Sequence, residues 1–337
     1  MPHGRSCIKK NSIMKKYNQI YINSTGIIAP QSTIIDGHFV CVEPVYKEFI
    51  NPVQLRRMSR ILKMGLGASS MCINSLPNVE IDAIVVGTGL SCIIDLEKFL
   101  VSILDGNEEG LSPTPFINSS HNTVAAQIAM MHKITGYNNT YCHRGASFES
   151  AFQDAVMLLN EGTANHILVG GIDEYSLHYH LMMNQEPKMK NVILGEGAAF
   201  FILENQQRVY TVAELKGVHF FLTRNGELNS NNTKLIKSEI TSFLQKQNLQ
   251  ISDIDIFISG KNGNCITDFI YDDLESDFLK NAKTHYFKHL CGEYMTSTAF
   301  AIGQATTLLK EQKGKNVLIY NHYNFINHSI ILLKNAL

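Results

Sequence analysis

The segment ASFESAFQDAVMLLNEGTANHILVGG, residues 146–171, indicates the architecture of this chain. Small or apolar residues lie on most faces of the predicted helix 146–161, and Gly162 follows as a residue that commonly ends helices. A helix that is apolar almost all round is expected at the centre of a protein. The next run, HILVGG (166–171), has the length and composition of a buried strand.

The same plan recurs in the C-terminal half of the chain. The segment 296–312 is again helical in pattern and rich in small residues, so it can pack closely against a neighbour. Two apolar strands, 316–321 and 328–334, follow it, as strands 166–171 and 197–204 follow the first central helix. The chain is therefore predicted to be an α/β protein of two duplicated halves, related by a pseudo-two-fold axis and packed as one five-layered αβαβα unit.

The predicted division places the first half at residues 19–205 and the second at 206–337, after an unstructured leader at 1–18. The leader is basic but lacks an apolar core, so it is not a secretory signal, and translation could start at Met1 or Met14. Further expected elements are a strand at 20–26 ending in a turn, a helix at 51–74, a strand at 83–89, a helix at 121–134, a helix at 232–247 and a strand at 255–259.

Composition excludes several classes of function. The 29 basic and 30 acidic residues nearly cancel, which gives no electrostatic basis for binding nucleic acid or an anionic membrane. Seven cysteines without a C-x-x-C pair indicate reduced thiols and a cytoplasmic protein. No apolar run reaches the length of a transmembrane helix.

Several motifs, in order and spacing, resemble the β-ketoacyl synthases of the thiolase superfamily. They are PVQLRRMSRILKMGLGAS (52–69), VVGTGLS (85–91), HNTVAAQIA (121–129) with Asn122 and Gln127 of the family helix, EGTANHILVGGIDE (161–174) and LGEGAAFFILE (194–204). The resemblance covers nearly the whole chain from about Tyr21 to Leu333 and implies the five-layered thiolase-like fold.

The resemblance also implies a chemistry. Enzymes of this family condense an acyl thioester with malonyl-carrier protein, with loss of CO2. A cysteine thiolate at the N-terminus of a buried helix holds the acyl chain. Two histidines stabilise the charge that develops on the malonyl group, and the N–H groups of the cysteine and of a Gly-Phe-Gly-Gly loop form an oxyanion hole.

This chain departs from the family at each of those positions. Counting back from Gly162 without a gap puts the nucleophile position at Gly145, and Cys142 lies three residues too early. Lys261 stands in place of the first histidine and Glu293 in place of the second. The glycine-rich loop is replaced by NHYNFIN (321–327), which has no glycine.

Other family positions are retained, namely Lys288, Gly292 and Asn327. A carboxylate at Glu293 would repel the malonyl carboxylate and the enolate that forms from it. Lys261 and Glu293 are expected to form an ion pair across the former active site. The resemblance therefore implies a degenerate site on an intact scaffold.

Degenerate subunits of this kind, called chain-length factors or KSβ, pair with active synthases in type II systems. The phrases HRGASFES, HNTVAAQ and KHLCGEYMTSTAFA resemble the ketoacyl-synthase-like proteins of aryl-polyene and flexirubin pigment clusters. The implied partners are an active ketosynthase subunit in a heterodimer, or a second copy in a homodimer, and an acyl carrier protein. The expected dimer contact is the strand near 138–143 with the helix 121–134, and segments 115–127 and 141–147 are expected to wall the partner's acyl tunnel. The residues assigned to this tunnel or interface are Phe116, Asn122, Thr123, Gln127, Tyr141 and Phe148.

Two other functions stay open. The chain could be an acyl transferase or malonyl decarboxylase that uses Cys142 with His143 or Lys261, or a homodimeric module that binds acyl carrier protein. No cofactor is expected, since GTGLSC (87–92) lacks the third glycine of a dinucleotide-binding motif. HYH (178–180) and His166 are interpreted as loop histidines and not as metal ligands, because no third ligand lies at a suitable spacing.

Overall fold

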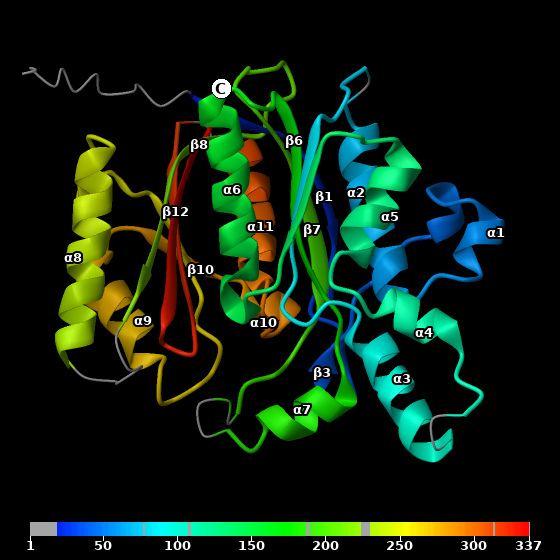
Figure 1. The fold of residues 1–337 in the computed structure, drawn as a ribbon. Helices are drawn as coiled ribbons and strands as arrows, with labels where there is room; N and C mark the ends of the chain where they lie inside the picture. Colours follow the sequence, from blue (N-terminus) through cyan, green and yellow to red (C-terminus); the bar gives the residue numbers. More distant parts are fainter. Residues whose placement is uncertain are drawn as a thin grey trace, which may run out of the picture.

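The computed structural model describes residues 19–76, 78–106, 109–186, 189, 191–223, 230–312 and 314–336 (Figure 1), so the expected leader lies outside the described residues. The strands of the main sheet are β1 (Ile20–Ile28), β4 (Ala83–Gly87), β5 (Tyr137–Tyr141), β6 (His166–Asp173), β7 (Gly197–Glu204), β8 (Ala213–Leu222), β9 (Ile256–Ser259), β10 (Lys283–Tyr286), β11 (Asn316–Tyr323) and β12 (Asn327–Lys334). They are hydrogen-bonded in the order β10-β9-β11-β12-β8-β1-β7-β6-β4-β5, and β2 (Ile34–Ile35) and β3 (His38–Phe39) form a separate pair.

The sheet order contains the predicted duplication. Read from its outer edge, the first half runs β5-β4-β6-β7-β1 and the second half runs β10-β9-β11-β12-β8. In each half the first three strands are parallel and the last two pairings are antiparallel. A short antiparallel pairing of β1 with β8 joins the two sets. The division of the chain into two halves near residue 205 stays a prediction.

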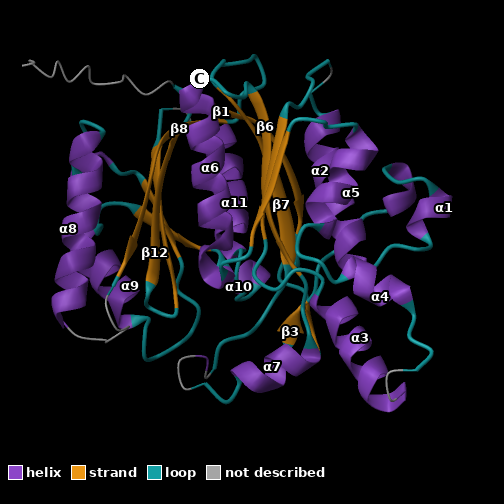
Figure 2. Ribbon diagram, viewed as in Figure 1, coloured by secondary structure: helices purple, strands orange, loops and turns teal. Residues whose placement is uncertain are grey.

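The helices are α1 (Pro52–Leu55), α2 (Arg60–Asn74), α3 (Ile93–Gly106), α4 (Pro113–Asn118), α5 (Thr123–His132), α6 (Ser147–Glu161), α7 (Leu177–Met183), α8 (Ser230–Lys246), α9 (Phe269–Asp273), α10 (Lys288–Cys291) and α11 (Ser297–Glu311). Figure 2 shows α6 and α11 side by side between the two halves of the sheet, with α2 and α5 outside one half and α8 and α9 outside the other. This arrangement confirms the predicted five layers.

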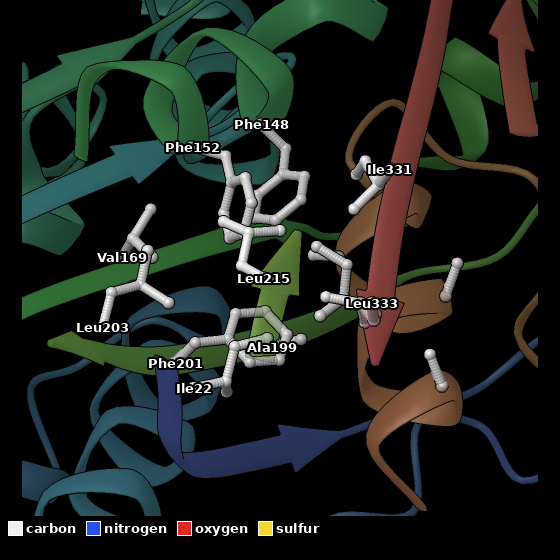
Figure 3. Packing of buried hydrophobic residues seen from close by; sticks show 14 of the residues in the cluster. Ile22, Phe148, Phe152, Val169, Ala199, Phe201, Leu203, Leu215, Ile331 and Leu333 are labelled. Atoms are coloured by element: carbon white, nitrogen blue, oxygen red, sulfur yellow. The ribbon is translucent and has the colours of Figure 1, made fainter. Parts of the chain in front are cut away.

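The central layer is held by one apolar cluster to which both halves contribute. Phe148 and Phe152 of α6 point into it, together with Phe201 of β7 and Ile331 and Leu333 of β12 (Figure 3), and all five side chains are fully buried. Burying a side chain of this size contributes roughly 1.5–3 kcal/mol. The two halves therefore share a core, and the outer helices cover separate clusters of their own.

Two predicted boundaries are wrong. The chain does not turn at Gly26, because β1 continues to Ile28. Helix α2 crosses β1 so closely there that a Cβ atom on Gly26 would lie 2.0 Å from the carbonyl oxygen of Ala68, so glycine serves a close contact and not a turn. The helix predicted at 51–74 is two helices, since Ser59 has an extended backbone that begins α2 anew.

The central helix α6 matches its prediction at both ends, with Gly162 in the left-handed conformation that closes it. It is not buried on every side, however. Met157 is 50% exposed and Gln153 is exposed too, so one face of α6 lies at the molecular surface. A nearly uniform apolar helix is thus central in the fold but open along one side.

Candidate functional site

The turn that leads into α6 is the first part of the site. The 3-10 turn Arg144–Ala146 holds Gly145, which is buried, directly before the helix. A Cβ atom added to Gly145 would lie 1.9 Å from Cγ of Tyr323 and 2.3 Å from its Cβ. Atoms cannot approach so closely, so the Tyr323 ring fills the place that a side chain at position 145 needs. The position assigned to the nucleophile has no room for a thiol beside this tyrosine.

The β11–β12 turn fixes Tyr323 in that place. Asn324 and Phe325 both adopt left-handed backbone conformations, with φ of 50° and 60°. That conformation is unfavourable for a bulky residue and persists only where the surroundings hold it. Phe325 is fully buried, and the hydroxyl of Tyr323 shares a hydrogen bond with that of Tyr179 on α7. The segment 321–327, which the resemblance compares with a glycine-rich loop, is a hairpin turn held in place by Phe325 and Tyr323.

A buried ion pair lies next to this turn. The Lys288 ammonium donates to Glu293 Oε2 at 2.6 Å, and Asn262 Nδ2 donates to the same oxygen at 2.7 Å. Only 2% of the Lys288 side chain and 7% of the Glu293 side chain are exposed. The carboxylate therefore neutralises the single lysine beside it and fixes the amide of Asn262.

The predicted ion pair of Lys261 with Glu293 is wrong. Lys261 pairs instead with Asp272 on α9, at the surface. The chain turns directly after β9, so Lys261 faces α9 while the next residue, Asn262, faces Glu293. Glu293 does form an ion pair, but the sequence could not show that Lys288 and not Lys261 reaches it.

Little space is left between these groups. The gap lined by Asn262, Glu293, His322 and Tyr323 measures about 10 Å³. A volume of that size holds about one water molecule. A malonyl thioester cannot enter this gap without a rearrangement of the turn.

Asp173 is a buried carboxyl group that the sequence analysis did not identify. It accepts hydrogen bonds from Gly89 N at 2.7 Å and from the backbone and hydroxyl of Thr296 at 2.9 and 2.8 Å. Burial raises its pKa to about 6 although these donors favour the charged form. Since Thr296 immediately precedes α11, Asp173 ties the N-terminal half to the C-terminal half beside the site.

Cys142 and His143, the alternative nucleophile and base, do not form a pair. The Cys142 thiol donates to the carbonyl oxygen of Gly89, with 3.3 Å between sulfur and oxygen, and the His143 ring lies 3.2 Å from the Ser150 hydroxyl. Burial and the nearby Asp173 carboxylate raise the pKa of Cys142. The thiol is therefore kept protonated, whereas a nucleophilic cysteine needs a lowered pKa.

Two of the residues at the retained family positions, Gly292 and Asn327, take part in backbone contacts near the site. Gly292 has φ of 77°, and a Cβ atom there would lie 2.7 Å from the Gly195 nitrogen. Gly195 N–H in turn donates to the Glu293 carbonyl at 3.0 Å. Asn327 is paired with Tyr323 at the start of β12. Glycine at 195 and 292 thus allows the two chain segments to touch.

The residues expected at an interface or tunnel differ in exposure. Phe116 on α4 is 60% exposed, and Asn122 is exposed and accepts a hydrogen bond from Thr140. Gln127 and Tyr141 are half-buried and Thr123 is buried. Phe148 must be removed from this set, because it is fully buried and packs against Phe152 and Phe201 in the central core.

Neither a metal site nor a membrane span emerges within the described ranges. His178 contacts Glu97 and His166 contacts Glu204, on separate elements. No group of three histidine, cysteine or acidic side chains in the part of the chain that the structure covers could hold a metal ion. None of the helices described there is long and apolar enough to cross a bilayer.

Comparisons with known proteins agree on the scaffold. The model of the β-ketoacyl synthase N-terminal domain matches residues 39–209, whereas no curated protein matches. Among solved structures, the ishigamide ketosynthase/chain length factor is similar with a TM-score of 0.81 at 15% identity, over 94% of this chain and 99% of that one.

Two further structures are similar over the same shares of both chains. One is a type II polyketide ketosynthase bound to a hexaketide, solved in complex with its acyl-carrier protein, with a TM-score of 0.76 at 14% identity. The other is a β-ketoacyl synthase from Burkholderia phymatum, with a TM-score of 0.75 at 14% identity. These likenesses confirm the thiolase-like fold predicted from the sequence.

Proposed function

Because this chain belongs to the β-ketoacyl synthase family, we propose that it is a catalytically silent member that pairs with an active 3-oxoacyl-carrier-protein synthase. In this role it acts in the cytoplasm as a chain-length factor of a type II fatty acid or polyketide system, of the aryl-polyene kind. The observation that carries the proposal is the Tyr323 ring, which fills the space a nucleophile at position 145 would need.

The chemistry of condensation fails at two further points. Glu293 places a negative charge where the malonyl carboxylate would bind, and it also neutralises the buried Lys288. The Cys142 thiol is held protonated against the carbonyl oxygen of Gly89. These features support a scaffold that keeps the family fold while lacking the group that would hold an acyl chain.

The proposed contact with the synthase is the outer edge of β5 with α4, α5 and α6. Strand β5 ends the main sheet, so one side of its backbone is open to another strand. Large apolar side chains are exposed on the elements of this proposed contact: Phe116 at 60%, Ile117 at 65%, Met130 at 63%, Tyr137 at 42% and Met157 at 50%. An apolar patch around an open strand edge favours a protein partner. In this arrangement Phe116 faces the partner's tunnel and limits product length.

Co-expression with the active synthase of the same system tests the proposal. We expect the two chains to co-elute as a heterodimer that makes a defined product in the presence of acyl carrier protein. Tyr137→Glu and Met130→Glu should abolish co-elution, while Val209→Glu, at a side chain 96% exposed and outside this patch, should not. In a heterodimer that still forms, Phe116→Ala should lengthen the product. Recovery of this chain alone, without any effect on the synthase's products, would contradict the proposal.

Intact-mass analysis distinguishes a catalytically silent chain from the alternative, an acyl transferase or malonyl decarboxylase. Cys142 is only half-buried, unlike Cys72 or Cys92, which is what keeps this alternative open. After exposure to acyl- and malonyl-carrier-protein thioesters, we expect the mass of the chain to stay unchanged. An adduct that disappears in Cys142→Ala, or malonyl decarboxylation lost in Lys261→Ala, would favour the alternative. A homodimer that binds carrier protein without any synthase would indicate a binding module.

A further inference from the structure

The loop that follows β9 contains an asparagine–glycine pair, Asn262–Gly263, beside the Lys288–Glu293 ion pair. The backbone nitrogen of a residue can attack the side-chain amide of an asparagine directly before it, which closes a cyclic imide and releases ammonia. Glycine favours this reaction because no Cβ atom crowds the attacking nitrogen, and asparagine is among the residues that are chemically labile. The proposed function assigns no chemistry to this loop.

The attacking nitrogen has a carboxylate at hydrogen-bond distance. Gly263 N–H donates to Asp268 Oδ2 at 2.9 Å, and Asn262 N–H donates to Oδ1 at 3.3 Å. A general base must lie within hydrogen-bond reach of the proton that it removes, and Asp268 meets that condition. Asp268 is 6% exposed, and burial raises its pKa, although the two N–H donors, Lys261 and Lys288 favour the charged form. A raised pKa makes the carboxylate a stronger base.

The side-chain amide of Asn262 is held at both of its polar atoms. Its Oδ1 accepts a hydrogen bond from Asn264 N–H at 3.1 Å, which forms an Asx turn, and its Nδ2 donates to Glu293 Oε2 at 2.7 Å. A donor at the oxygen stabilises the negative charge that develops there when the carbonyl carbon is attacked. The hydrogen bond to Glu293 holds the leaving nitrogen. One amide therefore has a nucleophile, a base and a donor to its oxygen within the same short loop.

Water also has access to this loop. Asn262 is half-buried and Gly263 is exposed, and both line a cavity of about 420 Å³ together with Tyr286 and His289. A cavity of this size holds several water molecules. Water is needed to carry a proton to the departing nitrogen and to open the imide afterwards.

We propose that Asn262 is a site of self-modification, at which attack by Gly263 N on Cγ yields a cyclic imide and then aspartate or isoaspartate. The bond between Gly263 N and Asn262 Cγ forms and the Cγ–Nδ2 bond breaks. Asp268 takes the proton of Gly263 N–H and returns it through water to the departing nitrogen, so one ammonia molecule is released and Asp268 is unchanged. One water molecule then opens the ring at either carbonyl group. The product replaces a hydrogen-bond donor to Glu293 by a second negative charge.

Peptide mass spectrometry of the full chain, incubated at neutral pH either folded or in urea, tests the proposal. The peptide that contains Asn262 should lose the mass of one ammonia and then gain that of one water. This reaction should be at least tenfold faster in the folded chain than in urea, because Asp268 is in place only in the folded chain. In urea, Asn262 should react at the rate of Asn225, which belongs to the other Asn–Gly pair of the sequence.

One substitution removes the base, and a matched one does not. Asp268→Asn should slow the reaction of the folded chain at least tenfold and leave its rate in urea unchanged. Asp277→Asn, at a carboxylate that is 77% exposed, should leave both rates unchanged. Modification that is as fast in urea as in the folded chain, an Asn262 that stays intact when folded, or an unchanged rate in Asp268→Asn would each overturn the proposal.

The pH profile of the unaltered chain guards against a folding defect in Asp268→Asn. Catalysis by a carboxylate should make the rate in the folded chain level off once Asp268 is ionised, whereas the rate in urea should keep rising with hydroxide concentration. The other ionisable groups that face Asp268 are Lys261, Lys288 and Tyr271, and lysine and tyrosine side chains ordinarily titrate well above the range of carboxyl groups. A rate in the folded chain that rises with hydroxide concentration throughout would exclude Asp268 as the base.

Discussion

Because Gly145 has no side chain, the Tyr323 ring can pack directly against its backbone. The Tyr323 ring lies where a Cβ atom would stand, so even alanine is too large. We expect Gly145→Ala to lower the free energy of unfolding by roughly 1–3 kcal/mol, the usual cost of an overpacked core. Urea denaturation measures this loss. In a Tyr323→Ala background the same substitution should cost little, and a cost that stays equal in both backgrounds would contradict the steric explanation.

The Lys288–Glu293 pair is the second residue-scale feature with a measurable consequence. Removing one partner leaves a buried charge without compensation, which typically costs about 3–5 kcal/mol. We therefore expect Lys288→Met and Glu293→Gln each to destabilise the chain by that amount in urea denaturation. The double variant Lys288→Met with Glu293→Leu should be less destabilised than the sum. The exposed pair Lys315–Asp255 is the control, where loss of a partner should cost about 1 kcal/mol or less.

At this scale the resemblance predicted which positions differ from the family, which stays a prediction, but it did not show which neighbours surround them. The resemblance located Gly145 and Glu293, and the structure places both at one site. The blocking residue, Tyr323, lies far away in the sequence and becomes visible only when the hairpin is folded against α6. The choice of Lys288 over Lys261 as the partner of Glu293 also depends on how the chain turns after β9, which no local pattern specifies.

At the scale of elements, three buried carboxyl groups make the stability of the folded chain depend on pH. Glu174 accepts a hydrogen bond from Ile94 N–H in the first turn of α3, and burial raises its pKa to about 8. With Asp173 near 6 and Glu149 near 7, three carboxyls bind protons more tightly in the folded chain than in the unfolded chain. The unfolded values lie near 4, so the folded state holds extra protons between about pH 4 and pH 8. Stability should therefore fall as the pH rises through that window.

The Glu174→Gln variant tests this pH dependence. Glutamine keeps the acceptor for Ile94 N–H but cannot ionise, so the fall in stability between pH 5 and pH 8 should become shallower. At pH 8 we expect the variant to be more stable than the parent by roughly 1–3 kcal/mol. Urea denaturation at several pH values measures both effects. Glu311→Gln on the exposed end of α11 is the control, and an equally steep fall in Glu174→Gln would refute the assignment.

The ends of helices and strands with a strong hydrophobic periodicity were predicted closely. The ends that depend on a tertiary contact were not. The pattern of 146–162 gave α6 and its closing glycine because an apolar helix and a left-handed glycine are both local signals. Gly26 carries the same local signal for a turn, yet it serves the approach of α2 to β1. The break between α1 and α2 and the open face of α6 likewise depend on neighbours that the sequence pattern does not name.

For the whole molecule, the two halves repeat one strand order yet do not have separate cores. The predicted duplication rested on a central helix and two strands in each half, and the sheet order repeats all five strands. The central apolar cluster draws on α6 and β7 from the first half and on α11 and β12 from the second. Asp173 and Glu149 add buried hydrogen bonds to Thr296 and Thr298 across the same boundary. Shared burial of this kind should make unfolding a single cooperative transition.

Fragments divided at the predicted boundary test that cooperativity. Residues 19–205 alone would expose the inner faces of α6 and β7, including the fully buried Phe148 and Phe201, and residues 206–337 would expose α11. Neither fragment buries enough apolar surface on that side to offset the loss, so each should be aggregated or unfolded by circular dichroism when expressed alone. Co-expressed, the two should associate into a folded complex with one thermal transition, because the β1–β8 pairing and the central layer can form between chains. A soluble and cooperatively folded first fragment would show that each half has a core of its own.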